Sequence, residues 1–276
     1  MFPLRDNIPA RTTPVVNWAL IAACALAFAA QLMTGEAGGS LVERFGMIPA
    51  RVFEPDGVIR ILDYQLVETL RGTVLREVSR EAAPAGVPAW LTLLTCIFLH
   101  GGWLHFLGNM WFLFIFGDNV EDRLGHARYL LFYLGCGAAA SVTHLLTAMD
   151  STVPTIGASG AIAGVMGAYM YLYPRAKVLT LVPIFIFIDI WVVPAVVFLG
   201  IWFALQLVQG AASFGSQGGG VAWWAHIGGF AVGLGVAVLM GRQQTLRPRV
   251  ELVRPNTERP GRYTRLDLRR RPGRWR

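Results

Sequence analysis

Six long apolar stretches divide this chain and restrict the folds open to it. They make the 276 residues 54% hydrophobic and only 15% charged, whereas a soluble domain carries about 25% charged residues. A helix that crosses a bilayer needs about 20 mainly apolar residues. The sequence therefore predicts an all-α membrane protein with six transmembrane helices. The predicted spans are residues 15–33, 102–117, 127–148, 157–173, 191–212 and 221–241.

Basic residues between the spans predict how the helices are oriented. Lys and Arg concentrate in the cytoplasmic loops of membrane proteins. An N-in, C-in topology places 18 of the 24 basic residues inside, and the short outer loops 149–156 and 213–220 then hold none. We therefore predict that both termini are cytoplasmic. An alternative reading of residues 15–33 is a cleaved signal peptide, which would leave the other five helices oriented as before.

The order of spans and polar segments predicts how the chain is divided. Residues 1–14 form a cytoplasmic lead, residues 34–101 a long extracytoplasmic loop that is partly membrane-embedded, and 102–241 hold helices two to six. Within the loop, residues 61–81 are expected to form an exposed amphipathic helix. A second connector, residues 178–190, is predicted to lie at the membrane interface or to re-enter it. Its β-branched run is short and is interrupted by Pro183.

The Arg-rich tail, residues 242–276, explains the net charge of +7. It holds 12 of the 24 basic residues, together with four prolines, and we expect it to be disordered. Basic residues near a membrane surface are attracted to anionic lipids by roughly 1 kcal/mol each. We therefore expect the tail to contact the inner leaflet, and we predict no nucleic-acid partner.

Four polar residues in the spans are candidates for function. Polar side chains are costly in hydrocarbon, so each needs a reason to be there. His105, Ser159 and His226 lie three to five residues from the predicted outer ends of helices two, four and six, a depth of roughly 5–8 Å. Asn109 is one turn deeper than His105 and on the same face. The four side chains are therefore predicted to meet at one level.

Small residues predict which helices touch at that level. Ser159 is followed at four-residue spacing by Ala163 and Gly167, and Gly233 follows His226 on its helix. Small residues at this spacing allow membrane helices to approach closely. If the two faces pack together, the Ser159 hydroxyl and the His226 imidazole come within the 2.6–3.2 Å that activation of a nucleophile needs.

This arrangement predicts acyl-transfer chemistry with Ser159 as nucleophile and His226 as its base. No carboxylate is placed to orient His226, which favours a Ser–His dyad over a triad. The donors available to an oxyanion are His105, Asn109 and the backbone N–H of Ser159. Metal binding by His100, His105 and His226 is an alternative, although no acid or cysteine lies at that depth to complete a site.

Short motifs lie in order on alternate predicted helices. They are Phe98-Leu99-His100 followed by His105-x-x-x-Asn109, then Gly157-x-Ser159-Gly160, then Ala225-His226-x-x-Gly229, with Glu121-Asp122-Arg123-Leu124-Gly125 after the second helix. This combination, over roughly residues 89–241, resembles the rhomboid family of intramembrane serine proteases. The first loop departs from well-known bacterial members, in which an Arg follows the Trp. Here Leu91 follows Trp90.

The resemblance implies a six-helix rhomboid-like bundle that hydrolyses peptide bonds in or near transmembrane helices. It implies that Ser159 and His226 are catalytic, that His105 and Asn109 stabilise the oxyanion, and that no cofactor or metal is needed. The partners would be single-span or polytopic membrane-protein substrates. The Arg- and Ala-rich composition suits a bacterial plasma membrane. Two alternatives stay open: a non-catalytic relative that binds membrane helices, and a transporter or channel that uses the same polar cluster.

Overall fold

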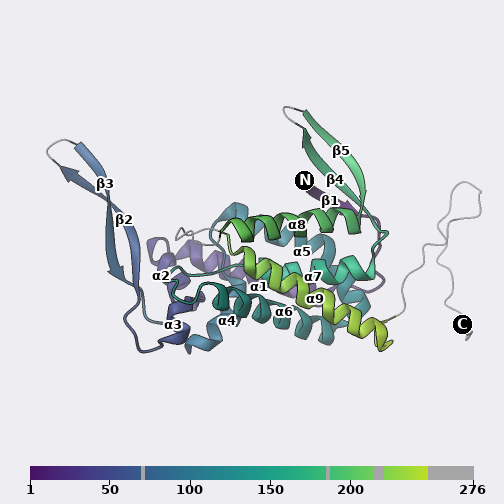
Figure 1. The fold of residues 1–276 in the computed structure, drawn as a ribbon, viewed down its shortest axis with the longest axis horizontal. Coiled ribbons are helices and arrows are strands. Elements are labelled where there is room, and N and C mark those ends of the chain that lie inside the picture. The colour runs from purple at the N-terminus through teal and green to yellow at the C-terminus, as the bar shows by residue number, and fades with distance from the viewer. Residues whose placement is uncertain (70–71, 185–186, 214–220, 248–276) are drawn as a thin grey trace, which may run out of the picture.

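A computed structural model describes residues 1–69, 72–184, 187–213 and 221–247 of the chain. Six longer helices form its body (Figure 1). They are α1 (Val15–Met33), α5 (Trp103–Leu124), α6 (His126–Thr147), α7 (Ser159–Leu172), α8 (Ala195–Ala212) and α9 (Trp223–Arg242). Each coincides with a predicted span to within a few residues, except that α5 continues seven residues past the predicted end at 117 and α8 begins four residues after 191.

Successive helices of the body alternate in direction. The start of α7 meets the start of α9 where Ser159 contacts His226. The start of α1 meets the end of α5, where the backbone N–H of Asn17 donates to Glu121 over 2.8 Å. We call the end of the bundle that contains Ser159 and His226 the site end, and the opposite end, with Glu121, the terminal end. Helices α5, α7 and α9 all run from the site end to the terminal end.

Length and apolarity identify fewer spans than the predicted six. Among the described residues, α1, α6, α8 and α9 are long and apolar enough to cross a membrane. A fifth span results if the short helical segment Ala89–Phe98 and α5 count together, although the two meet at a bend of 80°. The sixth candidate, α7, is apolar but has only 14 residues. It is largely buried among the other helices, so it needs no lipid-facing length of its own.

The loop between α1 and α5 is folded, and one prediction for it was wrong. It contains α2 (Glu36–Phe45), α3 (Pro49–Phe53), the strands β2 (Arg60–Thr69) and β3 (Gly72–Glu81), and the short helical turns η1 (Ala89–Leu91), α4 (Thr92–Thr95) and η2 (Cys96–Phe98). The strands β2 and β3 pair as an antiparallel hairpin where an amphipathic helix was predicted over 61–81. Gly72 and several β-branched residues in that window favour strands, and the apolar positions fit a period of two as well as a helical one.

A second small sheet corrects the all-α prediction further. Residues 178–190, predicted as an interfacial connector, belong to strands β4 (Lys177–Ile184) and β5 (Phe187–Pro194). The predicted polar lead contributes β1 (Phe2–Asp6), and the sheet order is β1-β4-β5. The fold is therefore mostly helical with two sheets that project from the helical body (Figure 1). Adjacent strands satisfy the backbone of this short β-branched run, which cannot complete a helix around Pro183.

Two buried carboxylates at the terminal end form hydrogen bonds with the start of the chain. Both oxygens of Glu121 accept backbone N–H groups, from Val16 at 3.0 Å and from Asn17 at 2.8 Å. The neighbouring Asp122 accepts from Arg11 and Thr12, each at 2.9 Å. The two bonds to Glu121 satisfy N–H groups in the first turn of α1, which have no partner inside the helix. Of the predicted tail, Arg242 is the last residue of α9, and the backbone N–H of Arg247 donates to the carbonyl of Arg123 at 2.8 Å. The remaining 29 positions, 248–276, lie outside the described residues.

Candidate active site

Ser159 and His226 are in direct contact at the site end. Ser159 is the first residue of α7, and His226 lies in the first turn of α9. The Ser159 Oγ and the His226 Nε2 are 2.7 Å apart, within the distance that activation of a serine requires. His226 is only 8% exposed, so water does not compete for most of its ring. The sequence predicted this contact, and the catalytic roles of the two residues stay predictions.

Glycines on α7 and α9 bring the two side chains together. A Cβ added to Gly229 would lie 2.0 Å from the carbonyl oxygen of Gly160, and one added to Gly233 would lie 2.0 Å from that of Gly164. Both distances are shorter than any real contact, so only glycine fits at either position. The two backbones therefore touch along the predicted small-residue faces. This close approach lets a serine, whose side chain is short, reach the imidazole.

Two backbone hydrogen bonds hold the loop that leads into Ser159. The N–H of Thr155 donates to the carbonyl of Met47 at 2.8 Å, and the N–H of Gly157 donates to that of Cys96 at 2.9 Å. Gly157 has a φ of +126°, a conformation that L side chains rarely adopt. The folded first loop thus fixes where α7 begins.

His105 and Asn109 face the same point, as their spacing predicted. A Cβ on Gly157 would lie 2.7 Å from His105 Nε2 and 3.7 Å from Asn109 Nδ2. His105 Nδ1 accepts the backbone N–H of Gly101 at 3.3 Å, so the proton of the neutral ring is on Nε2 and points to the site. Asn109 Nδ2 is buried and has no hydrogen-bond partner among the described residues. Two donors are therefore directed at the turn before Ser159.

Comparison with known protein families agrees with the resemblance found in the sequence. Residues 88–243 match the family described as the Rhomboid domain, which is more than half of the chain. The chain belongs to the rhomboid family. Its matched region contains all four predicted site residues and the five helices from α5 to α9. Together with the apolar helices, family membership makes the chain an integral membrane protein.

Several known rhomboid proteins resemble parts of this chain. "Rhomboid protein 1, mitochondrial" of Saccharomyces cerevisiae is 30% identical over 54% of the chain and 41% of its own length. "Rhomboid-like protein 11, chloroplastic" of Arabidopsis thaliana is 39% identical over 28% of the chain and 27% of its length. "Rhomboid protease GluP" of Bacillus subtilis is 34% identical over 41% of the chain and 23% of its length. The chain thus spans less than half of each of these relatives.

Sequence reasoning missed one buried side chain at the rhomboid site. The Oε1 atom of Gln206, on α8, lies 2.7 Å from the Nδ1 atom of the His226 ring. An amide oxygen can only accept, so Nδ1 carries the proton and Nε2 is left to accept from Ser159. Gln206 interrupts an apolar span, and that signal could have singled it out by the rule that found His105 and Asn109.

His100 is buried beside the site. Its ring packs edge-on against His105 and Phe106 at 5.4 Å, and neither ring nitrogen has a partner among the described residues. Within the part of the chain that the structure describes, no group of three or more His, Cys, Asp or Glu side chains is arranged to hold a metal ion. The residues that the metal alternative named do not form such a group.

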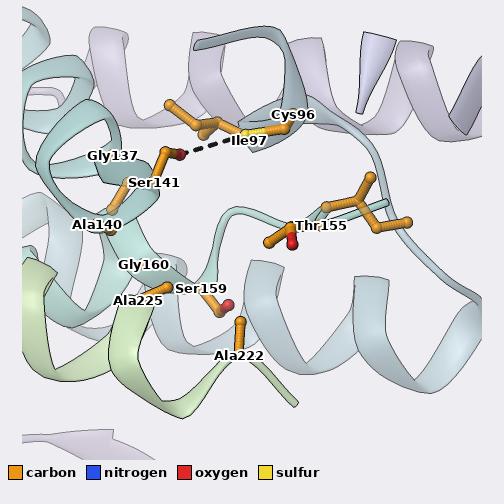
Figure 2. A pocket seen from close by; sticks show the side chains of 13 residues that line it. Cys96, Ile97, Gly137, Ala140, Ser141, Thr155, Ser159, Gly160, Ala222 and Ala225 are labelled. Carbon is orange, nitrogen blue, oxygen red and sulfur yellow. Dashed lines mark hydrogen bonds between the residues drawn. The ribbon is translucent and has the colours of Figure 1, made fainter. Parts of the chain in front are cut away.

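A small cavity lies behind Ser159 (Figure 2). Its volume of about 20 Å³ is enough for a single water molecule. Cys96 and Ser141 line it together with Ser159, and the thiol and hydroxyl of the first two are 3.4 Å apart. The cavity therefore offers polar groups to a water molecule close to the serine.

Proposed function

We propose that the chain is an intramembrane serine protease that hydrolyses peptide bonds in or near transmembrane helices of other membrane proteins. The observation that carries the proposal is the 2.7 Å contact between Ser159 Oγ and His226 Nε2 inside a bundle of apolar helices. Family membership supports it, because some of the similar proteins are named as proteases.

The first step is acylation of Ser159. His226 Nε2 takes the hydroxyl proton while Oγ attacks the carbonyl carbon of the substrate, and the imidazolium then protonates the leaving amine. The negative charge on the carbonyl oxygen receives hydrogen bonds from His105 Nε2–H, Asn109 Nδ2–H and the backbone N–H of Ser159. Each donor is a residue of the rigid helices α5 and α7, so little reorganisation is needed as charge develops.

The second step is hydrolysis of the acyl-enzyme by water. His226 again acts as the base, and the cavity beside Ser159 supplies room for one water molecule. A substrate helix satisfies its own backbone hydrogen bonds and shields its carbonyls. The substrate must therefore unwind locally before Ser159 reaches the scissile bond, which favours substrates with small or helix-breaking residues there.

The surroundings of the enzyme follow from the same proposal. We place the site end toward the outer face of a bacterial plasma membrane and both termini in the cytoplasm, on the distribution of Lys and Arg. The Arg-rich tail, residues 242–276, would lie against anionic lipids of the inner leaflet. No cofactor takes part in the proposed reaction.

A fluorophosphonate probe tests the proposal directly. The purified protein in lipid vesicles is expected to be labelled, and the Ser159→Ala variant is expected to be unlabelled. Cleavage of a model single-span protein, with His226→Ala as the inactive control, then tests peptide hydrolysis. A folded wild-type protein that neither reacts with the probe nor cleaves the model protein would refute the proposed function.

A further inference from the structure

Gln206 is a buried polar residue in a helix whose other buried side chains are apolar. Only two amides, Gln206 and Gln209, occur within α8. Gln209 is exposed, whereas Gln206 is only 6% exposed and is directed at α9. A buried amide in a membrane helix needs a partner. Its partner is the Nδ1 of His226, at 2.7 Å.

This partner determines which nitrogen of His226 can act as a base. A neutral imidazole carries one proton, and the hydrogen bond made by one nitrogen decides the state of the other. With the proton held on Nδ1 by Gln206 Oε1, the lone pair of Nε2 faces Ser159 Oγ. The other tautomer would place a proton between Nε2 and Ser159, and the ring could not accept the hydroxyl proton.

The same contact continues to act after the proton has moved. When His226 becomes an imidazolium, the Nδ1–H bond to an amide oxygen stabilises the positive charge, as a carboxylate does in a Ser-His-Asp triad. No carboxylate among the described residues makes a hydrogen bond to His226. The nearest acid in sequence to α8, Asp189, is exposed and bonded to Trp191 at 2.9 Å. Gln206 therefore fills the third position with a neutral group.

Helix α8 packs against α9 around the hydrogen bond between Gln206 and His226. Trp202, Gln206 and Gly210 follow each other at four-residue spacing and so share one face. The Trp202 ring lies 5.9 Å from the His226 ring, and a Cβ on Gly210 would lie 3.1 Å from Ile227 Cδ1. The opposite face of α8 is exposed. The position of α8 thus sets the orientation of the His226 ring.

We propose that Gln206 is the positioning residue of His226: its amide oxygen holds the proton of the neutral ring on Nδ1 and so leaves Nε2 to accept from Ser159. This inference rests on the proposed function and adds to it a third member of the site. Displacement of α8 from α9 removes the acceptor of Nδ1 and leaves the tautomer of His226 unspecified.

The test compares two substitutions of Gln206 with a matched change on the same helix. Gln206→Met keeps the length of the side chain without an acceptor, and Gln206→Glu keeps the acceptor. We expect Gln206→Met to lower the rate of fluorophosphonate labelling and the kcat for a model substrate by about 10–100-fold, with KM unchanged. The labelling rate and the kcat of Gln206→Glu are expected to stay within a few-fold of the wild-type values. Those of Gln209→Met, the matched change on the same helix, are expected to equal the wild-type values.

The pH profile separates positioning from packing. In Gln206→Glu, a carboxylate stabilises the imidazolium, so the acid limb of the rate profile is expected to move to higher pH. A packing role predicts equal losses in the Met and Glu variants with no movement of that limb. That result, or wild-type rates for Gln206→Met at every pH, would overturn the inference and leave the proposed function intact. A wild-type protein that the probe does not label would overturn both.

A measurement on the unmutated site guards against a variant that fails to fold. Solid-state NMR of the protein with nitrogen-15-labelled histidines, with His226 assigned by its loss in His226→Ala, reports which ring nitrogen is protonated. The inference requires the proton of the neutral ring on Nδ1. A proton on Nε2 would contradict it without any reference to activity.

Discussion

At the site end, three polar side chains from α5 and α9 converge around Ser159 of α7, whereas at the terminal end Glu121 and Asp122 hold the start of the chain. Every carboxylate oxygen of Glu121 and Asp122 has a donor. At the site end, by contrast, Asn109 Nδ2 is buried without a partner in the described chain.

This difference separates two uses of polarity inside an apolar bundle. A buried polar group that is fully bonded stabilises the fold, and removing its partner leaves other groups unsatisfied. A buried donor kept without a partner lowers stability, and it is preorganised for charge that develops in a reaction. We therefore expect substitutions at the terminal end to change stability, and substitutions at the site end to change rate.

The largest effect is expected from Glu121→Ala at the terminal end. The change leaves the backbone N–H groups of Val16 and Asn17 and the ring of His126 without their acceptor. We expect the free energy of unfolding in mild detergent to fall by about 3–5 kcal/mol. Asp150→Ala, at an exposed acid, is the control. The labelling rate of the folded fraction should stay at the wild-type value. A lower rate would contradict the proposal that the terminal end affects stability and the site end affects rate.

Asn109→Ala at the site end is expected to give the opposite result. Loss of one oxyanion donor lowers kcat by about 10²–10³-fold. The midpoint of thermal unfolding should stay the same or rise, because the change removes a buried donor that has no partner among the described residues. The measurements are cleavage of the model substrate and thermal unfolding of the same sample. A large drop in stability with a normal rate would identify Asn109 as a packing residue.

Gly233→Ala tests the contact that joins the two ends. The added Cβ would meet the carbonyl oxygen of Gly164 at 2.0 Å, so α9 must move away from α7. We expect a loss of about 1–3 kcal/mol in stability, together with slower labelling, because the Ser159–His226 distance depends on this contact. Gly235→Ala on the same helix meets no atom within 4 Å and should leave both quantities near wild type.

The smallest effect is expected from the pH dependence of Asp6 at the terminal end. Burial raises the pKa of Asp6 from 3.8 to about 6. Hydrogen bonds to Asp6, including one from Tyr169, lower the pKa but by less than burial raises it. The folded state then holds a proton that the unfolded state has released, so the contribution of Asp6 to stability falls as pH rises from about 4 to about 6. Unfolding of wild type and Asp6→Asn across this range measures the difference. We expect wild type to lose stability relative to Asp6→Asn as pH rises; a wild type that gained stability relative to the variant over this range would contradict the sign.

Local pattern predicted the helices well and the strands poorly. The apolar stretches gave six helix positions because burial in lipid demands a continuous apolar run. The hairpin β2–β3 was mistaken for a helix because its apolar residues satisfy both periods, and the choice between them depends on whether a partner strand is available. The strand β4 pairs with β5 and also with β1, a segment more than 170 residues away in sequence, and no window of local sequence can reveal that second pairing.

The candidate site was predicted in part for similar reasons. Ser159, His226, His105 and Asn109 lie near helix starts, so their depth follows from counting residues along each span. Gln206 lies midway along α8, and its contact with His226 depends on how α8 is rotated and shifted against α9. That rotation is a property of the packed bundle.

The sequence by itself determined the apolar spans, the common depth of the four polar residues and the glycine faces that allow α7 and α9 to touch. Each of these is fixed by composition and spacing along one helix. Only the tertiary structure decided the contact between Gln206 and His226, the tautomer of His226 that follows from it, and the pairing of the strands. Those features join separate segments, and a hydrogen bond about 2.7 Å long forms only when both segments are already in position.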